Sequence, residues 1–416
     1  MAKGKKVVIK EGADKLPVIK PTIIQEASSS DLKTQFRIYV GSYEHNLLCL
    51  SLMLQKEKTP VFQSIFHFQA HSLSIKAIAS AKRYLVTGSN DEHIRIYDLQ
   101  KRKELGTLMG HQGSITCLKF STEGNGEDGD VERTAGKWLL SGSEDGKLII
   151  WRTKDWEMFG TLKGHQGRVN DLAIHPSGRI AVSVGDDKTV RLWNLMTAKK
   201  AANLRVKKDW QKGEKVRWSL KGDYFFVGLL NQMLIYKTSD AKVVGEVAFK
   251  QTLMNLEVYD INGTEYAVVG LGNGALQFYK VKDLVEDEKT EPEFTLQGHT
   301  NRVKDFKLHK HNDETYLISI SSDGSIVVWD MTLKDQVAVY NTGERLNCLE
   351  VTAETVEKAD TMKRRYNDID DAEASASESE AEDTEELKRI MLNDRKKKKK
   401  KSKKGGKKEK ISVELE

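Results

Sequence analysis

The sequence predicts an all-β fold: a seven-bladed β-propeller closed by a C-terminal strand and followed by a disordered charged C-terminal tail. Three observations predict it. A phrase of His, Ser or Thr, Asp and an aromatic residue occurs four times, and weaker copies continue its spacing. A strand-like segment after the last copy also has no blade of its own. Recurrence at a fixed period is typical of folds built from stacked repeats.

The repeated phrase predicts a buried hydrogen-bond network in each copy. The hydroxyl lies four residues before the aspartate, and the aromatic residue lies six after it. A buried indole N–H needs an acceptor, which a serine hydroxyl supplies while it donates to histidine. An aspartate in the tight turn between two strands can fix the histidine tautomer. The four expected tetrads are His71, Thr87, Asp91, Tyr97; His111, Ser141, Asp145, Trp151; His165, Ser183, Asp187, Trp193; and His299, Ser319, Asp323, Trp329.

The same residue types also occur in hydrolases, so a catalytic role has to be weighed. A Ser-His-Asp triad occurs once in a protein, beside an oxyanion hole, whereas this set repeats in phase. The chain has no Gly-x-Ser-x-Gly elbow, and its three cysteines show no metal-ligand spacing. We therefore expect a protein that is not an enzyme, with no catalytic residue, no metal and no cofactor.

The position of the aromatic residue in the phrase can be followed through the whole repeat region. It gives seven anchors, one for the third strand of each blade, and the separations centre on the 40 to 45 residues typical of a WD40 blade. The phrase itself resembles the WD40 repeat. The anchors are Leu50, Tyr97, Trp151, Trp193, Tyr236, Tyr279 and Trp329.

The two ends of the repeat region predict how the ring closes. Strand-like segments 36–42 and 46–52 match the second and third strands of a blade, with no inner strand before them. Segment 345–352 resembles the inner strand at 114–121, so we expect it to complete the first blade. Pairing the two chain ends would remove the open sheet edges.

The expected organisation has three parts. Residues 1–35 form a basic and polar extension without an apolar signal segment, and residues 36–353 form the propeller. Residues 121–136 are an acidic loop insertion whose spacing does not match a calcium loop. No apolar run approaches the roughly 18 residues of a membrane span, so we expect a soluble intracellular protein without a membrane partner.

The tail, residues 354–416, differs sharply in composition from the rest of the chain. Its acidic segment 368–386 holds ten Asp and Glu and no Lys or Arg, and each of its three serines precedes an acid by three residues. We expect disorder, and phosphorylation at Ser375, Ser377 and Ser379. A basic segment follows, suited to nuclear or nucleolar targeting, to contact with the rRNA backbone, or to both. It comprises Lys396, Lys397, Lys398, Lys399, Lys400, Lys401, Lys403, Lys404, Lys407, Lys408 and Lys410.

Two arginines near the start of inner strands are candidates for a partner-binding rim. Arg168 and Arg302 each follow a tetrad histidine by three residues, and Asp171 and Asp305 follow them by three more. The alternative is a local Arg-Asp pair within each strand. The pattern alone does not decide between a rim for partners and a structural pair.

Several phrases resemble the maintenance-of-killer / p21-activated-kinase-interacting family of WD40-repeat proteins, over roughly residues 36–352. They are Val40-Gly41-Ser42-Tyr43-Glu44, Ala70-His71-Ser72-Leu73-Ser74-Ile75-Lys76, Leu139-Leu140-Ser141-Gly142-Ser143-Glu144-Asp145-Gly146, Ile174-His175-Pro176-Ser177-Gly178 and Asn301-Arg302-Val303-Lys304-Asp305.

The resemblance implies a nucleolar assembly factor for the large (60S) ribosomal subunit. Such a protein is a scaffold that places or chaperones a basic ribosomal-like client on pre-60S particles, as a monomer within a large complex. Its implied partners are pre-60S assembly proteins and, through the Lys-rich tail, rRNA. The alternative that the resemblance implies is a regulator that binds and inhibits a p21-activated-type protein kinase.

Overall fold

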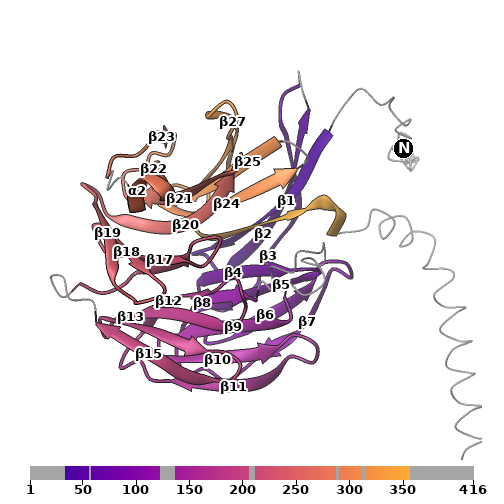
Figure 1. Cartoon of the computed structure of the whole chain (residues 1–416). Coiled ribbons are helices and arrows are strands. Elements are labelled where there is room, and N and C mark those ends of the chain that lie inside the picture. The colour runs from indigo at the N-terminus through magenta and orange to yellow at the C-terminus, as the bar shows by residue number, and fades with distance from the viewer. Residues whose placement is uncertain are drawn as a thin grey trace, which may run out of the picture.

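The computed structural model describes residues 33–55, 58–121, 136–205, 211–286, 290–311 and 314–356. These residues form seven four-stranded antiparallel sheets that follow one another around a central axis (Figure 1). The all-β propeller with seven blades is thereby confirmed. Most of the 121–136 insertion, the first 32 residues, the three tail serines and the Lys-rich segment lie outside the described ranges.

Each blade has one inner strand that lines the central channel. Six of these strands open their blade in chain order, and the seventh comes from the C-terminal end of the described chain. The inner strands are β4 (Ile75–Ala81), β8 (Ile115–Phe120), β12 (Val169–Ile174), β16 (Lys215–Trp218), β20 (Leu253–Ile261), β24 (Val303–His311) and β28 (Leu346–Ala353).

The second and third strands form the middle of each blade. The second strands are β1 (Lys33–Ser42), β5 (Tyr84–Ser89), β9 (Trp138–Ser143), β13 (Ile180–Gly185), β17 (Tyr224–Gly228), β21 (Thr264–Leu271) and β25 (Glu314–Ser321). The third strands are β2 (Asn46–Gln55), β6 (Ile94–Asp98), β10 (Lys147–Arg152), β14 (Thr189–Asn194), β18 (Gln232–Lys237), β22 (Ala275–Lys280) and β26 (Ser325–Asp330).

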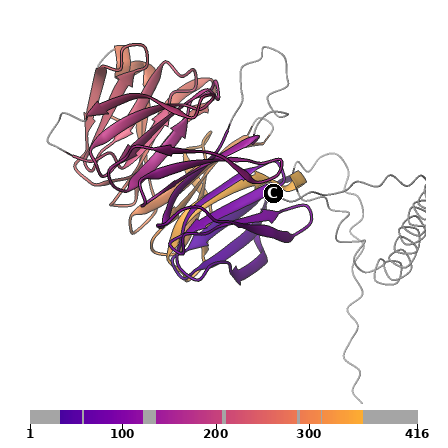
Figure 2. The same cartoon turned by 90° about the horizontal axis from the view of Figure 1, so that it is seen from below.

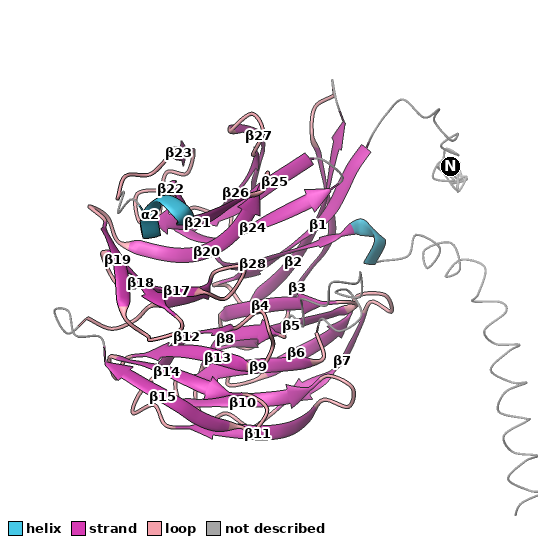
Figure 3. Ribbon diagram, viewed as in Figure 1, coloured by secondary structure: helices cyan, strands magenta, loops and turns pink. Residues whose placement is uncertain are grey.

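The outer strands are largely exposed, and the described helices are short (Figure 3). Helix α2 (Val281–Glu286) follows β22, and the 3₁₀ turn η1 (Glu354–Val356) follows β28; neither is long and apolar enough to cross a bilayer. The outer strands are β3 (Val61–Gln69), β7 (Lys103–Leu108), β11 (Glu157–Lys163), β15 (Lys199–Arg205), β19 (Val243–Ala248), β23 (Phe294–Gln297) and β27 (Asp335–Asn341).

The ring is closed by pairing between the two ends of the described chain, as expected. Strand β28 pairs with β1 from Ala353 opposite Phe36 to Leu346 opposite Ser42. In Figure 1 the orange-yellow β28 therefore belongs to the same sheet as the indigo β1. Strand β28 also contacts the neighbouring inner strands β24 and β4, so it completes the channel wall.

The hydrophobic core lies between the blades rather than at the centre of the ring. Seven clusters of buried side chains occur, and each joins two adjacent blades; one of them spans β28, β1 and the blade β24–β27. The view from below shows the neighbouring sheets packed face to face (Figure 2). Close packing requires glycine at some crossings: a Cβ on Gly88 would lie 2.5 Å from Ile115 of the next inner strand.

The weaker anchors occupy the same structural position as the tryptophans. A bulge in the pairing of third and outer strands directly precedes Leu50, Tyr97, Trp151, Trp193, Tyr236 and Trp329. In each case the extra residue of the bulge lies in the outer strand, opposite the anchor, so the six anchors share one position in their blades. Tyr236 stacks on Phe225 with ring centroids 4.9 Å apart, in place of the indole network.

Removal of the closing strand should abolish the cooperative unfolding of the propeller. A chain that ends at Gly343 leaves β1 with an unpaired edge and opens the apolar cluster that spans β28. We expect a broad, low-temperature transition by circular dichroism and calorimetry. A chain that ends at Val356 keeps β28 and is the matched control, which should melt like the full chain. Unchanged melting of the chain ending at Gly343 would contradict the closure.

Candidate interaction face

The tetrad histidines and aspartates gather at one face of the propeller, where the inner strands begin. We call this the histidine face: it consists of the loops that precede the inner strands and of the turns between second and third strands. The structure brings together all four side chains of two predicted tetrads in the expected way, and in a third His71 with Thr87 and Asp91 but without a hydrogen bond from the Tyr97 hydroxyl. His165 Nδ1 lies 3.0 Å from both carboxylate oxygens of Asp187, and its Nε2 lies 2.7 Å from Ser183 Oγ.

The other histidines show how the network varies. His71 contacts Asp91 at 2.9 Å and Thr87 at 2.8 Å, whereas His111 lies 3.3 Å from Asp145 and 2.8 Å from Ser141. The three tryptophans Trp151, Trp193 and Trp329 donate their indole N–H to Ser141, Ser183 and Ser319 at 2.9, 2.7 and 2.9 Å. The hydroxyl therefore joins the third strand to the histidine loop.

The tetrad of His299 differs from the expected geometry, so the prediction of a direct His-Asp contact is wrong there. His299 Nδ1 contacts Ser325 Oγ at 2.8 Å, and that hydroxyl bonds to Asp323; the predicted direct contact of His299 with Asp323 is replaced by a relay. Asp323 also accepts from the hydroxyl of Thr300 at 2.8 Å. The Ser325 hydroxyl, two residues after the aspartate, fits between the carboxylate and the ring. Thr189 has the same place after Asp187 but leaves the direct contact with His165 intact.

Burial sets the charge state of these groups. It lowers the pKa of His71, His111 and His165 against the opposing effect of the paired aspartates, and it lowers the pKa of His299 to about 4. Burial acts to raise the pKa of Asp323, but hydrogen bonds from Ser325 and Thr300 bring it to about 2. The histidines are thus neutral and the aspartates ionised at neutral pH, which suits a scaffold of fixed hydrogen bonds.

The structure divides the four candidate rim residues. Arg168 and Arg302 lie exposed on the histidine face, where Arg168 pairs with Glu144 of the neighbouring turn at 3.1 Å. Asp171 is buried and pairs with Arg217 of the next inner strand at 2.5 Å, so it does not pair with Arg168. Asp171 therefore has no place on a partner-binding rim, and the alternative of a local Arg-Asp pair is also wrong for this strand.

Asp171 and Asp305 have a common structural task. Each accepts the backbone N–H of the following residue and that of the next blade's inner strand: Asp171 from Val216 at 3.2 Å, Asp305 from Leu349 at 2.9 Å. Asp305 also accepts from Asn255 at 2.7 Å. A carboxylate at this position ties two inner strands together, and this explains the recurrence of aspartate better than a binding role does.

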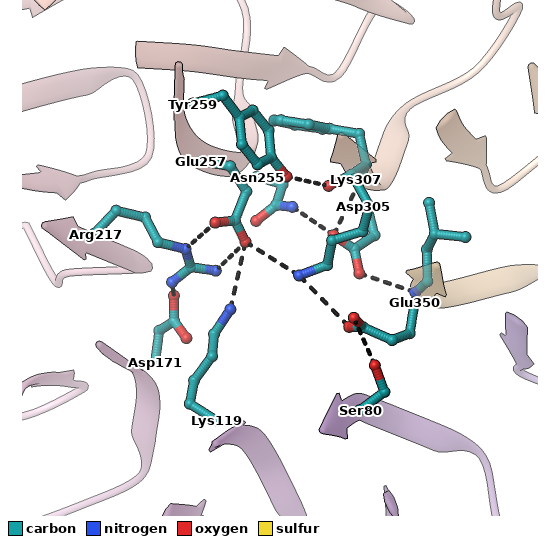
Figure 4. A network of polar contacts seen from close by, with 12 residues as sticks. Ser80, Lys119, Asp171, Arg217, Asn255, Glu257, Tyr259, Asp305, Lys307 and Glu350 are labelled. Atoms are coloured by element: carbon teal, nitrogen blue, oxygen red, sulfur yellow. Dashed lines mark hydrogen bonds and ion pairs between the residues drawn. The ribbon is translucent and has the colours of Figure 1, made fainter. Parts of the chain in front are cut away.

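The channel beyond these aspartates is filled by an ion-pair network (Figure 4). Arg217 lies at its centre, with Nη2 2.8 Å from Glu257 Oε1 and Nη1 2.5 Å from Asp171. Lys119 and Lys307 approach Glu257 at 3.4 and 3.8 Å. Five inner strands contribute side chains to this network, so its contacts form only when these strands are in the correct register.

Glu350 of the closing strand connects that strand to the network. Lys307 Nζ lies 3.7 Å from Glu350, and Ser80 of β4 donates to the same carboxylate at 3.1 Å. Burial raises the pKa of Glu350 despite Lys307. Burial also acts to raise the pKa of Glu257, but Arg217, Lys119 and Lys307 hold it well below its usual range. The arrangement has no nucleophile poised beside a base and neutralises its own charges.

The spacing within one repeat does not predict this network, although the sequence carries a signal of it. When the inner strands are aligned, Cys117, Asp171 and Asp305 occupy one common position. The charged residues of the network all lie two residues after that position in their own strands: Lys119, Arg217, Glu257, Lys307 and Glu350. An alignment of the inner strands alone would have shown a charged residue in an apolar strand at one repeated position.

Loss of the central arginine should destabilise the propeller strongly. In Arg217→Met the buried carboxylates of Asp171 and Glu257 lose their partner, and we expect the free energy of unfolding in urea to fall by about 3–5 kcal/mol at neutral pH. Arg168→Met, which removes an exposed ion pair, is the control and should cost at most about 1 kcal/mol. Equal effects of the two substitutions would contradict a structural role for the network.

The His299 tetrad predicts a dependence of stability on pH. The folded state keeps His299 neutral down to pH 4, whereas the unfolded chain takes up the proton near 6.5. The stabilisation is therefore complete above 6.5 and is lost as pH falls toward 4, by about 3 kcal/mol. His299→Gln lacks this contribution, so its deficit relative to the natural chain in urea should shrink over that range. Parallel stability curves would contradict the assignment.

Comparison with known proteins supports the repeat assignment. The WD40 family model, described as WD domain, G-beta repeat, matches residues 156–194 and 290–330, which contain two of the tetrad tryptophans. A model described as LRRK2 beta propeller matches residues 15–174. Both matches agree with the propeller seen in the structure.

Similar proteins cover most of the chain. Protein MAK11 of Saccharomyces cerevisiae is 55% identical over 410 residues, which are 92% of this chain and 99% of the relative. The p21-activated protein kinase-interacting protein 1-like of Gallus gallus is 34% identical over 69% of this chain and 72% of its own length. Shk1 kinase-binding protein 15 of Schizosaccharomyces pombe is 25% identical over 75% of this chain and 83% of its own length. The chain therefore belongs to the WD-repeat family that includes Protein MAK11 and the p21-activated protein kinase-interacting proteins.

Proposed function

We propose that this protein is a non-catalytic scaffold in the assembly of the large ribosomal subunit. It acts in the nucleus and nucleolus, where it places or chaperones a basic ribosomal-like client on pre-60S particles. Membership of the MAK11 family, with 55% identity along 92% of the chain, is the observation that carries this proposal. The sequence resemblance described above supplies the link to ribosome assembly.

The chemistry of the described residues supports a scaffold. The side chains of the Ser-His-Asp sets are engaged in hydrogen bonds to tryptophan or to a relay hydroxyl. The charges of the ion-pair network in the channel neutralise one another. Binding then depends on the broad faces of the ring and on the tail. The acidic segment 368–386 would screen a basic client, and the Lys-rich segment that follows it would contact rRNA phosphates.

A second candidate function is regulation of a protein kinase. It is favoured by the names of the relatives, which are a p21-activated protein kinase-interacting protein and a Shk1 kinase-binding protein. In that role the propeller would bind and inhibit a kinase of the p21-activated type. The two functions differ in the partners that accompany the chain in the cell.

Affinity purification from nuclear extract separates the two functions. We expect the full chain to recover large-subunit precursor RNA together with pre-60S assembly proteins. Arg217→Met, which disturbs the ring, is the matched control. A comparison of what it and the natural chain recover shows how much of the binding depends on the folded propeller. Recovery of a kinase without ribosomal precursors would overturn the assembly role.

The role of the tail in RNA contact is tested by crosslinking to nascent rRNA. A chain that ends at Lys388 lacks the Lys-rich segment but keeps the acidic one and the propeller. We expect it to lose most of the crosslinking of the full chain and to lose nucleolar accumulation. Crosslinking equal to that of the full chain would show that RNA is not bound by the Lys-rich segment.

A further inference from the structure

The mouth of the channel on the histidine face carries more positive than negative charge. Deeper in the channel, Arg217 and Lys307 each lie within 4 Å of two carboxylates. At the mouth, five cations come together without an ion pair to any described carboxylate. We call this set the basic mouth; it consists of Lys76, Lys215, Arg302, Lys304 and Arg345.

The backbone aims two of these lysines at the mouth. Lys76 and Lys304 are the extra residues of the bulges near the starts of β4 and β24: the pairing passes from Ile75 to Ala77 and from Val303 to Asp305. A bulge redirects its extra side chain out of the regular alternation of the strand. Lys76, Lys215 and Lys304 all line the recess at the channel axis. Its lining also includes Asp171, Glu257 and Asp305, but six Lys and Arg side chains outnumber these three carboxylates.

Lys304 shows how close these charges are. Its pKa is lowered to about 8, first by burial and then by repulsion from Arg302, Lys76, Lys215 and Arg345. A half-buried cation surrounded by four others destabilises the folded chain, and a bound anion would remove that repulsion. In the ion-pair network deeper in the channel, by contrast, acids on the inner strands neutralise Arg217 and Lys307.

Apolar side chains border the basic mouth. The ring of Tyr43 lies between Lys76 and Arg345, whose charged groups are 5.7 and 5.2 Å from its centroid, and it remains 49% exposed. Leu73, in the loop before β4, is 47% exposed. The tyrosine is fixed at this place because its backbone N–H bonds to the carbonyl of Arg345 at 2.7 Å.

We propose that the basic mouth binds an acidic peptide segment of a partner protein, with a carboxylate among Lys76, Lys215 and Lys304 and an apolar side chain against Tyr43 and Leu73. The recess at the axis measures about 70 Å³, which suits a side-chain carboxylate and is too small for a nucleotide. Exposed leucine beside the cations also favours a peptide over a phosphate backbone. This partner is distinct from the basic client proposed above, because the mouth repels a basic segment.

The proposal predicts that charge removal costs binding without costing stability. Substitution of Lys76, Lys215 and Lys304 together by Gln relieves the repulsion, so the triple variant should melt at the same temperature as the full chain or higher. The single variant Lys304→Gln keeps the test valid if the triple variant folds poorly. A large loss of melting temperature in the single variant would show that Lys304 has a structural role, against the proposal.

Binding is measured by fluorescence anisotropy on the full chain, with a short labelled peptide in which Glu and Asp alternate with Leu. We expect the triple variant to bind it at least about tenfold more weakly, a loss of about 1.4 kcal/mol. The matched control substitutes Lys154, Lys199 and Lys200 by Gln. These exposed lysines lie away from the histidine face, and the net charge changes equally. The control should retain the affinity of the natural chain.

Two binding results would also overturn the proposal. Equal weakening in the mouth variant and the control would assign the binding to overall charge or to the Lys-rich tail. A labelled single-stranded RNA is measured in parallel, and we expect its affinity to change less than twofold in the mouth variant. A loss for RNA that equals or exceeds the loss for the peptide would make the mouth a nucleic-acid site. All of these measurements use purified protein. A negative result for peptide binding therefore does not contradict the role in ribosome assembly, and a negative result of the affinity purification does not contradict peptide binding at the mouth.

Discussion

The structure depends on the pairing of β28 with β1. Seven sheets arranged in a ring have no core at the centre, because the apolar clusters lie between neighbouring blades. An open ring would expose two such faces and two sheet edges, and the pairing of β28 with β1 covers them. The pairing also brings Arg345 and Glu350 beside residues of the first two blades. The channel and its mouth thus exist only in the closed ring.

The ion-pair network serves register more than net stability. Buried ions lose their hydration, and their mutual attraction roughly offsets that loss. The network instead makes misalignment of an inner strand costly in free energy. A slip of one residue would leave Arg217 or Glu257 buried without a partner. Asp171 and Asp305 act in the same way through backbone N–H groups of the next strand. Blades that lack a tetrad are aligned by these inner contacts.

Periodicity in the sequence made the blades and the tetrads predictable, because each depends on spacing within one repeat. The closing strand was predictable although it pairs with β1 across the whole ring, because segment 345–352 resembles an inner strand and the first blade had none. The channel network was missed since its pairs join residues about 40 or more positions apart, such as Arg217 with Asp171 and with Glu257. The alternative of a local pair between Arg168 and Asp171 is wrong because the strand directs the two side chains to different surroundings, where they pair with Glu144 and Arg217. The relay at His299 depends on Ser325, whose hydroxyl competes with the ring for Asp323, and no spacing rule indicates which contact wins.

The contrast between the two ends of the inner strands bears on how a rigid ring selects partners. Side chains inside the channel are held by ion pairs and hydrogen bonds, so they have little freedom to adapt to a ligand. At the mouth, Lys76, Lys215 and Lys304 form no ion pair within the described part of the chain, and Tyr43 is held by its backbone beside two cations. A rigid wall beneath uncompensated cations is preorganised for an anion, since the repulsion is already present in the free protein and binding needs only to relieve it. The charge that weakens the free ring is therefore the feature that gives this face its selectivity.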